Sequence, residues 1–211
     1  MTALNFIFEE EVIFIAMDTL SISTDKRTPY KFVSKIFPLP HLRGALCGTG
    51  NLDLVLDWHR EIQKNIIAQS IDFFAENSTD ILVKLNENYP KNATTTMYQF
   101  GYSQTLNKFR GFVFRSTNKF KLEELTFCTA HRPPVEDFNF DNFENNVDEN
   151  FIKLMTMQKQ LDDQKPDKAG IGGEIHRLIL MKNASKLDII HRFPDYEMQY
   201  RQMLRKLSDL K

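Results

Sequence analysis

The chain has 211 residues, of which 42% are hydrophobic and 26% are charged, and its formal net charge at pH 7 is −1. These values predict one globular domain over residues 1–211, and the small net charge argues against binding to nucleic acid or to an anionic membrane surface. Only Cys47 and Cys128 are present, and no run reaches the roughly 18 apolar residues of a membrane span, so we expect a reduced, cytoplasmic protein without disulfides.

The first fifty residues predict strands and turns. Residues 4–8 and 12–17 are rich in Ile, Phe and Val, and the glutamates at 9–11 between them indicate a hairpin with a charged turn. The run at 12–17 is almost continuously apolar, so we expect both of its faces to be covered. Residues 20–23 look like a short continuation of this strand, and further strands predicted at 31–37 and 42–47 form a second hairpin.

Helices begin after Gly50, where the hydrophobic spacing lengthens to about 3.6 residues. This spacing predicts a helix from residue 52 to about residue 67, with Asn51 or Thr49 as its cap. A shorter helix follows, capped by Ser78 or Thr79. The later predicted elements are strands at 95–103, 109–115 and 120–127, a helix at 147–164 with Leu161 on its apolar face, a hairpin of 174–181 and 187–191, and a C-terminal amphipathic helix at about 194–210.

This order of elements predicts the fold class. Strands and helices that come in blocks favour an α+β protein with two antiparallel sheets packed face to face and helices outside them. One segment, 136–150, is dense in Asp, Glu, Asn and Phe. We interpret it as an ordered surface loop, with docking of a partner or a neighbouring subunit as the alternative.

Three residues near the N-terminus form a possible catalytic set. Asp18 directly follows the apolar run at 12–17, and Lys35 lies in the predicted strand at 31–37. If Met1 is removed, Thr2 carries a free α-amine, which can accept the proton of its own hydroxyl because its ordinary pKa is about 7.7 to 8.0. A nearby lysine cation lowers that pKa further. The alternative is that Thr2 is an ordinary second residue and that Asp18 and Lys35 form a structural ion pair.

The residues around this set resemble the proteasome β-subunit branch of the N-terminal-nucleophile (Ntn) hydrolases. The apolar strand at 12–18, which ends in Ala-Met-Asp, is similar to that family's strand ending in Ala-x-Asp. Lys35-Ile36-Phe37 and the small-residue run at 44–50 are similar to its lysine strand and to the turn that opens its first helix. The resemblance implies a four-layer αββα sandwich, which is two antiparallel sheets flanked by helices, and a homo-oligomer.

The resemblance also implies roles for individual residues. Thr2 would be the nucleophile, Lys35 would ease its deprotonation, Asp18 would hold the lysine, and the amide of Thr49 or Gly48 would stabilise the oxyanion. The implied activity is threonine-type cleavage of a peptide or small amide substrate through an acyl-enzyme, provided that Met1 is removed. The alternative is a catalytically silent protein of the same fold that serves assembly or partner binding. Three departures from the family's pattern favour this alternative. They are Leu20, Ile22 and the absence of a serine from residues 167–173.

Other residues predict no second chemistry. The histidines lack the spacing of metal ligands, so we expect no metal. The glycine-rich residues 170–173 lack the Lys-Thr/Ser of a phosphate loop, and we expect a tight connection there and no cofactor. Cys47 is predicted to be a small buried side chain. The histidines are His41, His59, His131, His176 and His191.

Overall fold

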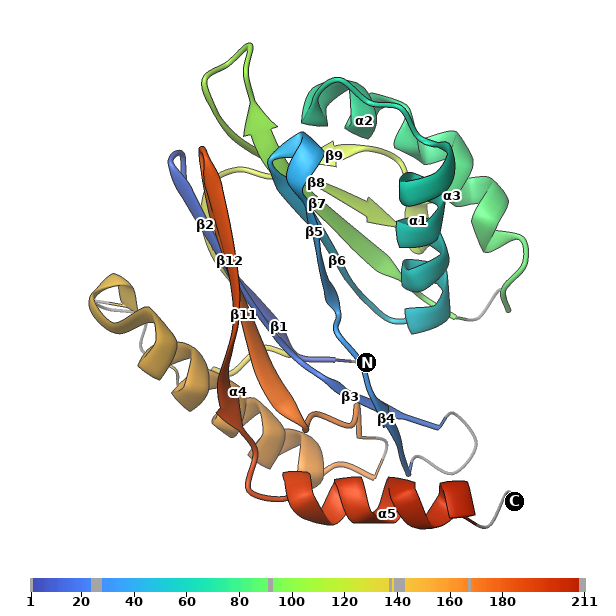
Figure 1. The fold of residues 1–211 in the computed structure, drawn as a ribbon, viewed down its shortest axis with the longest axis vertical. Helices are drawn as coiled ribbons and strands as arrows, with labels where there is room; N and C mark the ends of the chain where they lie inside the picture. Colours follow the sequence, from blue (N-terminus) through green and yellow to red (C-terminus); the bar gives the residue numbers. More distant parts are fainter. Residues whose placement is uncertain are drawn as a thin grey trace.

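The computed structural model describes residues 2–23, 28–90, 93–136, 138, 143–166 and 168–208. Within these residues the chain forms five α-helices and three antiparallel sheets (Figure 1). The predicted α+β class is confirmed. The number of sheets differs from the prediction, because a small two-stranded sheet accompanies the two larger ones. No helix in the described part of the chain is long and apolar enough to cross a membrane.

The first five-stranded sheet has the order β10-β1-β2-β11-β12. Within this sheet, β1 and β2 form the predicted first hairpin, in which Leu4 lies opposite Met17. β2 is paired on both edges, by β1 and β11. Its Ile13 and Ile15 enter the core between the sheets and its Ala16 enters the core on the opposite face of this sheet, so both of its faces are covered, as predicted. The strands are β1 (Leu4–Phe8), β2 (Val12–Asp18), β10 (Cys128–Arg132), β11 (Glu174–Met181) and β12 (Ala184–Arg192).

The second five-stranded sheet has the order β5-β6-β7-β8-β9, and the small sheet pairs β3 with β4. A 3₁₀ turn, η1 (Pro40–Leu42), joins β5 to β6. The strands of the second sheet are β5 (Ile36–Leu39), β6 (Gly44–Thr49), β7 (Thr96–Ser103), β8 (Lys108–Arg115) and β9 (Glu123–Glu124); those of the small sheet are β3 (Leu20–Ile22) and β4 (Pro29–Phe32).

The helices lie on the outer sides of the sheets (Figure 1). Three of them pack on the second sheet, α4 packs on the first sheet, and α5 lies against the small sheet. Asn51 caps the first helix by accepting hydrogen bonds from two backbone N–H groups, as predicted. The helices are α1 (Leu52–Asn65), α2 (Ile71–Glu76), α3 (Ser78–Asn86), α4 (Val147–Asp163) and α5 (Tyr196–Ser208), with short 3₁₀ turns η2 (Ser116–Asn118) and η3 (Phe143–Asn146).

Three apolar clusters hold these elements together. One lies between the two five-stranded sheets and includes Phe6 and Phe100, whose rings meet edge to face at 5.2 Å. A second surrounds the fully buried Trp58, between the second sheet and α1 to α3. A third, which includes Phe151, lies between α4 and the first sheet. The aromatic side chains of this phenylalanine-rich sequence therefore fill all three cores.

Two predicted strands are wrong. Residues 31–37 do not form one strand, because β4 pairs with β3 and β5 pairs with β6, and the chain between them passes from one sheet to another. Residues 120–127 contain only the two-residue β9, and β10 then joins the other sheet beside β1. Phe120 and Leu122 instead pack against the cluster around Trp58. Their burial explains the apolar signal without a strand.

Two helical features also differ from the prediction. Helix α2 was not expected, and its six residues are too few to show a helical period. In α4, Leu161 is 42% exposed, whereas Gln158 and Asp162 are buried. The amide of Gln158 exchanges two hydrogen bonds of 2.9 Å with Asn5 of β1. This polar pair sets which face of the helix turns inward.

Candidate active site

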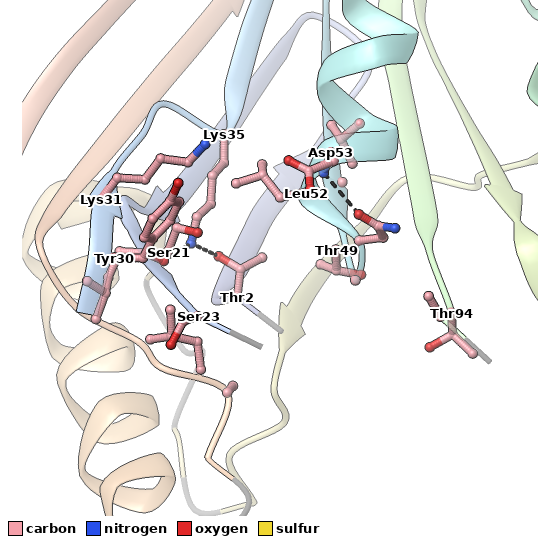
Figure 2. Close-up of a pocket in the computed structure, with 18 of the residues that line it drawn as sticks. Thr2, Ser21, Ser23, Tyr30, Lys31, Lys35, Thr49, Leu52, Asp53 and Thr94 are labelled. Carbon is pink, nitrogen blue, oxygen red and sulfur yellow. Dashed lines mark hydrogen bonds between the residues drawn. The ribbon is translucent and has the colours of Figure 1, made fainter. Parts of the chain in front are cut away.

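The first sheet brings Thr2 and Asp18 to the same end. Thr2 lies just before β1, Asp18 is the last residue of β2, and these two strands are antiparallel neighbours. Lys35 lies in the connection from β4 to β5, where the chain passes from the small sheet to the second large sheet. Three predicted site residues from separate parts of the chain therefore meet. Figure 2 shows the hydrogen bond between Lys35 and Thr2.

Lys35 is the centre of the hydrogen-bond network. Its Nζ donates to Thr2 Oγ1 at 2.6 Å and to Asp18 Oδ2 at 3.0 Å. A third hydrogen bond, of 2.7 Å, goes to the carbonyl oxygen of Leu20. An ammonium group has three N–H donors, so these contacts use all of them. The Lys35 side chain is thus held in one position beneath the Thr2 hydroxyl.

The Asp18 carboxylate also accepts as many hydrogen bonds as it can. Its Oδ1 accepts the Thr2 hydroxyl and, at 2.9 Å, the N–H of Ala3. Its Oδ2 accepts Lys35 and, at 3.3 Å, the N–H of Gly172. A carboxylate offers about four lone-pair directions, and all of them are used here. The hydroxyl of Thr2 therefore lies between a fixed ammonium donor and a fixed carboxylate acceptor.

Burial changes the pKa of Lys35. The Asp18 side chain is 0% exposed and that of Lys35 is 5% exposed. Burial lowers the pKa of Lys35 below its ordinary value of 10.5, while the charge of Asp18 and its hydrogen bond act in the opposite direction. Lys35 therefore loses its proton more readily than a lysine on the surface does.

Thr2 and Lys35 lie in the wall of a cavity of about 990 Å³, which is close to the upper end of the usual range for small-molecule sites, about 300 to 1,000 Å³. One wall carries Ser21 and Lys31 from the small sheet, and the other carries Leu52 from the start of α1 (Figure 2). The cavity supplies space for a substrate beside the Thr2 hydroxyl.

Thr49, the fourth predicted site residue, lines the same cavity from the end of β6. β5 pairs with β6 only as far as Cys47, so the backbone of Gly48 and Thr49 extends beyond that ladder. A Cβ on Gly48 would lie 2.9 Å from the Val55 side chain and 3.0 Å from the Thr96 carbonyl oxygen. Glycine therefore lets this backbone pack directly against α1 at the edge of the cavity.

Sequence reasoning missed Asp162, at the end of α4. This buried carboxylate accepts hydrogen bonds from three consecutive backbone N–H groups, those of residues 169, 170 and 171, at 2.6, 2.8 and 3.2 Å. The next N–H along the chain, that of Gly172, is the one that binds Asp18. Asp162 therefore fixes the loop that orients Asp18. An aspartate next to Asp163 and a lysine-rich turn gives no sequence signal for this role.

The glycine-rich residues 170–173 thus form the tight connection that was predicted, and they also contact the site. Asp167, which the sequence analysis grouped with them, lies outside the described residues. Cys47 is fully buried, and burial raises the pKa of its thiol far above the ordinary value. Its thiolate is therefore strongly disfavoured, which excludes it as a nucleophile. The described residues contain no group of three His, Cys, Asp or Glu side chains arranged to hold a metal ion.

The role of Asp162 leads to a first prediction. Changing Asp162→Asn should lower the free energy of unfolding by about 1 to 3 kcal/mol, because an amide has one acceptor oxygen in place of two and loses the charge. Urea denaturation measures this change. The matched control is Asp163→Asn, which affects an aspartate whose side chain is 46% exposed and pairs with Lys159, and should cost less than about 1 kcal/mol. Equal losses in the two variants would contradict the role given to Asp162.

Comparison with known proteins gives one informative result. No family model matches the chain, and no curated protein matches its sequence. Among solved structures, the Gly-1 mutant of Anbu from Hyphomicrobium sp. strain MC1 is similar, with a TM-score of 0.62 and 12% sequence identity over 100% of this chain and 95% of that chain. Anbu is a proteasome-like protein of the Ntn type. At this identity the likeness shows the fold alone.

This result corrects the family assignment made from the sequence. The chain was identified there with the proteasome β-subunit branch of the Ntn hydrolases, and that assignment is wrong. The similar structure is Anbu, the identity is only 12%, and no family model matches. The short motifs at residues 12–18 and 44–50 describe strands and a small-residue turn. They carry information about local structure and do not identify a branch of a family.

Proposed function

We propose that this protein hydrolyses amide bonds and that Thr2 is the nucleophile once the bond between Met1 and Thr2 has been cleaved. One observation carries the proposal: the Thr2 hydroxyl is bound between Lys35 and Asp18 in the wall of a cavity large enough for a substrate. The fold likeness to Anbu supports it. The proposal includes a four-layer arrangement of helix, sheet, sheet and helix around the site, which the three apolar clusters support.

The first half of the reaction would acylate Thr2. The free α-amine of Thr2 takes the proton from Oγ1, which attacks the substrate carbonyl carbon and forms a C–O bond. The carbonyl oxygen becomes an oxyanion, which the backbone N–H of Gly48 or Thr49 stabilises. When the intermediate collapses, the C–N bond breaks and the proton on the α-amine moves to the departing amine. An ester on Thr2 and a free amine product remain.

Lys35 and Asp18 would prepare this step. The ammonium group of Lys35 donates to Oγ1 and stabilises the negative charge that grows there as the proton leaves. Its charge also lowers the pKa of the neighbouring α-amine, so that more of the amine is neutral near pH 7. Asp18 holds Lys35 in place through the bond at 3.0 Å. Water then attacks the ester, the α-amine accepts a proton from it, and Oγ1 regains a proton as the acid product leaves.

The second candidate is a catalytically silent protein that keeps this fold for assembly or partner binding. The buried ion pair between Lys35 and Asp18 favours it, because such pairs also occur as purely structural features. The two candidates differ in the fate of Met1. If Met1 stays attached, the nitrogen of Thr2 is an amide and cannot act as a base.

The test is to purify the protein from its native host, measure its intact mass, and treat it with a peptide vinyl sulfone. We expect a mass without Met1 and a single adduct that maps to Thr2. The rate of adduct formation should rise with pH as the α-amine loses its proton, with a midpoint at or below its ordinary pKa of about 7.7 to 8.0. Retention of Met1 together with absence of an adduct would refute the enzyme and favour the silent protein.

A further inference from the structure

The cavity beside Thr2 carries an uneven set of charges. Among the described residues, the charged ones that line it are Lys31, Lys35, Asp53 and Lys168. Lys35 is committed to the hydrogen bonds with Thr2 and Asp18, and Lys168 is engaged in contacts of its own. Asp53 is exposed in the first turn of α1, where water screens its charge. Within the described part of the lining, Lys31 is therefore the half-buried charge that remains for a substrate.

Lys31 lacks an anionic partner in the described part of the chain. Its Nζ lies 5.6 Å from the centre of the Tyr30 ring, and no carboxylate of the described residues forms an ion pair with it. Other partly buried cations of this protein are treated differently. Arg110, Lys159 and Arg177 each form ion pairs with two carboxylates. A partly desolvated ammonium without such a partner favours a bound anion.

A hydroxyl group lies beside this ammonium. Ser21 of β3 is directly opposite Lys31 of β4 in the antiparallel ladder, so the two side chains share one face of the small sheet. Both residues line the cavity. An ammonium and a hydroxyl on the same face offer two donors to the two oxygens of a carboxylate.

The position of this pair decides which part of a substrate it meets. The carbonyl oxygen of Leu20 accepts a hydrogen bond from Lys35 Nζ, so β3 begins within the catalytic group itself, and Ser21 is the next residue. Successive strand residues are only about 3.3 Å apart. Figure 2 shows Ser21 and Lys31 on the same side of the cavity as Lys35, and Leu52 and Asp53 across from them. The substrate group closest to Thr2 on that wall belongs to the residue whose carbonyl is attacked.

We propose that this site prefers substrates with an aspartate or glutamate at the residue whose carbonyl Thr2 attacks, and that Lys31, assisted by Ser21, binds the acidic side chain. This inference rests on the proposed function of Thr2. It adds to that function a substrate class, which is a peptide with an acidic residue on the acyl side of the cleaved bond. Across the cavity from Lys31, Leu52 is apolar and Asp53 is an anion, so neither of these two side chains offers a donor to that carboxylate.

The test uses four acetylated tripeptide vinyl sulfones that differ only in the residue next to the electrophile: Glu, Gln, Lys or Leu. The rate of adduct formation on Thr2 is followed by intact mass. We expect the Glu probe to react about tenfold faster than the Gln probe, which has the same shape, because a charge-assisted hydrogen bond is lost with Gln. Lys31→Gln should make these two rates equal. Lys31→Glu should make the Lys probe the faster one.

A matched control and the Leu probe separate the possible outcomes. Lys64→Glu makes the same charge change on α1 away from the cavity lining, and the preference for the Glu probe should persist. Equal rates for Glu and Gln in the unmodified protein, or a preference that survives Lys31→Gln, would overturn the role of Lys31. In those cases the Leu probe would still label Thr2, and the proposed function would stand. Failure of all four probes would overturn the proposed function and this inference with it.

Discussion

Replacing Thr2 with alanine should abolish adduct formation with an electrophilic amide analogue and reduce amide hydrolysis by about 10³-fold or more, because no other group takes over once a nucleophile is removed. Thr2→Ser keeps a hydroxyl between Lys35 and Asp18 and should retain measurable activity. Intact mass after labelling and release of an amine product from a peptide measure the two effects.

The control for this change lies in the same cavity. Thr94 also lines it, and Thr94→Ala removes the same hydroxyl and methyl groups from a side chain that is exposed. Labelling of that variant should be close to normal. If Thr2→Ala were still labelled at the rate of the unmodified protein, the nucleophile would lie elsewhere, and the hydrogen bonds of Thr2 would have only a structural role.

Breaking the buried ion pair should have the largest effect on stability. Asp18→Asn leaves the Lys35 charge without its partner, and we expect a loss of about 3 to 5 kcal/mol in the free energy of unfolding. The double variant Asp18→Asn with Lys35→Met removes both charges and should recover most of that loss, since replacing a whole buried pair is often nearly neutral. Urea denaturation of the two single variants and the double variant gives the coupling energy.

An exposed ion pair gives the matched control. Arg60 pairs with Asp57 on α1, and the Arg60 side chain is 65% exposed, so Arg60→Met should change stability by less than about 1 kcal/mol. A double variant of Asp18 and Lys35 that is as unstable as the sum of its single variants would show that the two charges do not depend on each other.

The cost of Asp18→Asn should also depend on pH. Burial lowers the pKa of Lys35, so between that value and 10.5 the folded protein binds fewer protons than the unfolded chain, and stability rises with pH. Without the Asp18 carboxylate the pKa of Lys35 falls further, and this range extends to lower pH. The variant should therefore be least stable at low pH and recover as the pH rises. Destabilisation that stays constant as the pH rises towards 10.5 would contradict this account.

The amino-acid sequence predicts well those features that depend on local pattern. The hairpin of β1 and β2 follows from alternating and continuous apolar runs, and Asn51 is recognisable as a cap because its side chain precedes a helical period. Thr2, Asp18 and Lys35 were found as candidates because of their spacing on neighbouring predicted strands and because the residues around them resemble the proteasome β-subunit branch. The structure brings these three into contact, and their catalytic role stays a prediction.

Features that depend on partners distant in the sequence were missed. β10 is an edge strand with the sequence CTAHR, in which only the small Cys128 and Ala130 alternate on the inward face, so its apolar pattern is weak and its ladder with β1 defines it. The inward face of α4 was misjudged at Leu161, because Gln158, which is hydrogen-bonded to the distant Asn5, and Asp162, which is hydrogen-bonded to the loop at 169–171, are the residues that turn inward there. Polar contacts of this kind leave no hydrophobic period to detect.

The contact between Asp18 and Gly172 also has a consequence for biosynthesis. These two residues are 154 positions apart in the chain, and β11, which follows Gly172, closes the free edge of β2. A ribosome releases the N-terminal strands first, so Thr2 and Asp18 emerge long before the loop and the helix that hold Asp18. The complete arrangement can form only when most of the chain has been made. A nascent chain therefore exposes Thr2 and Lys35 without the geometry on which the proposed reaction depends.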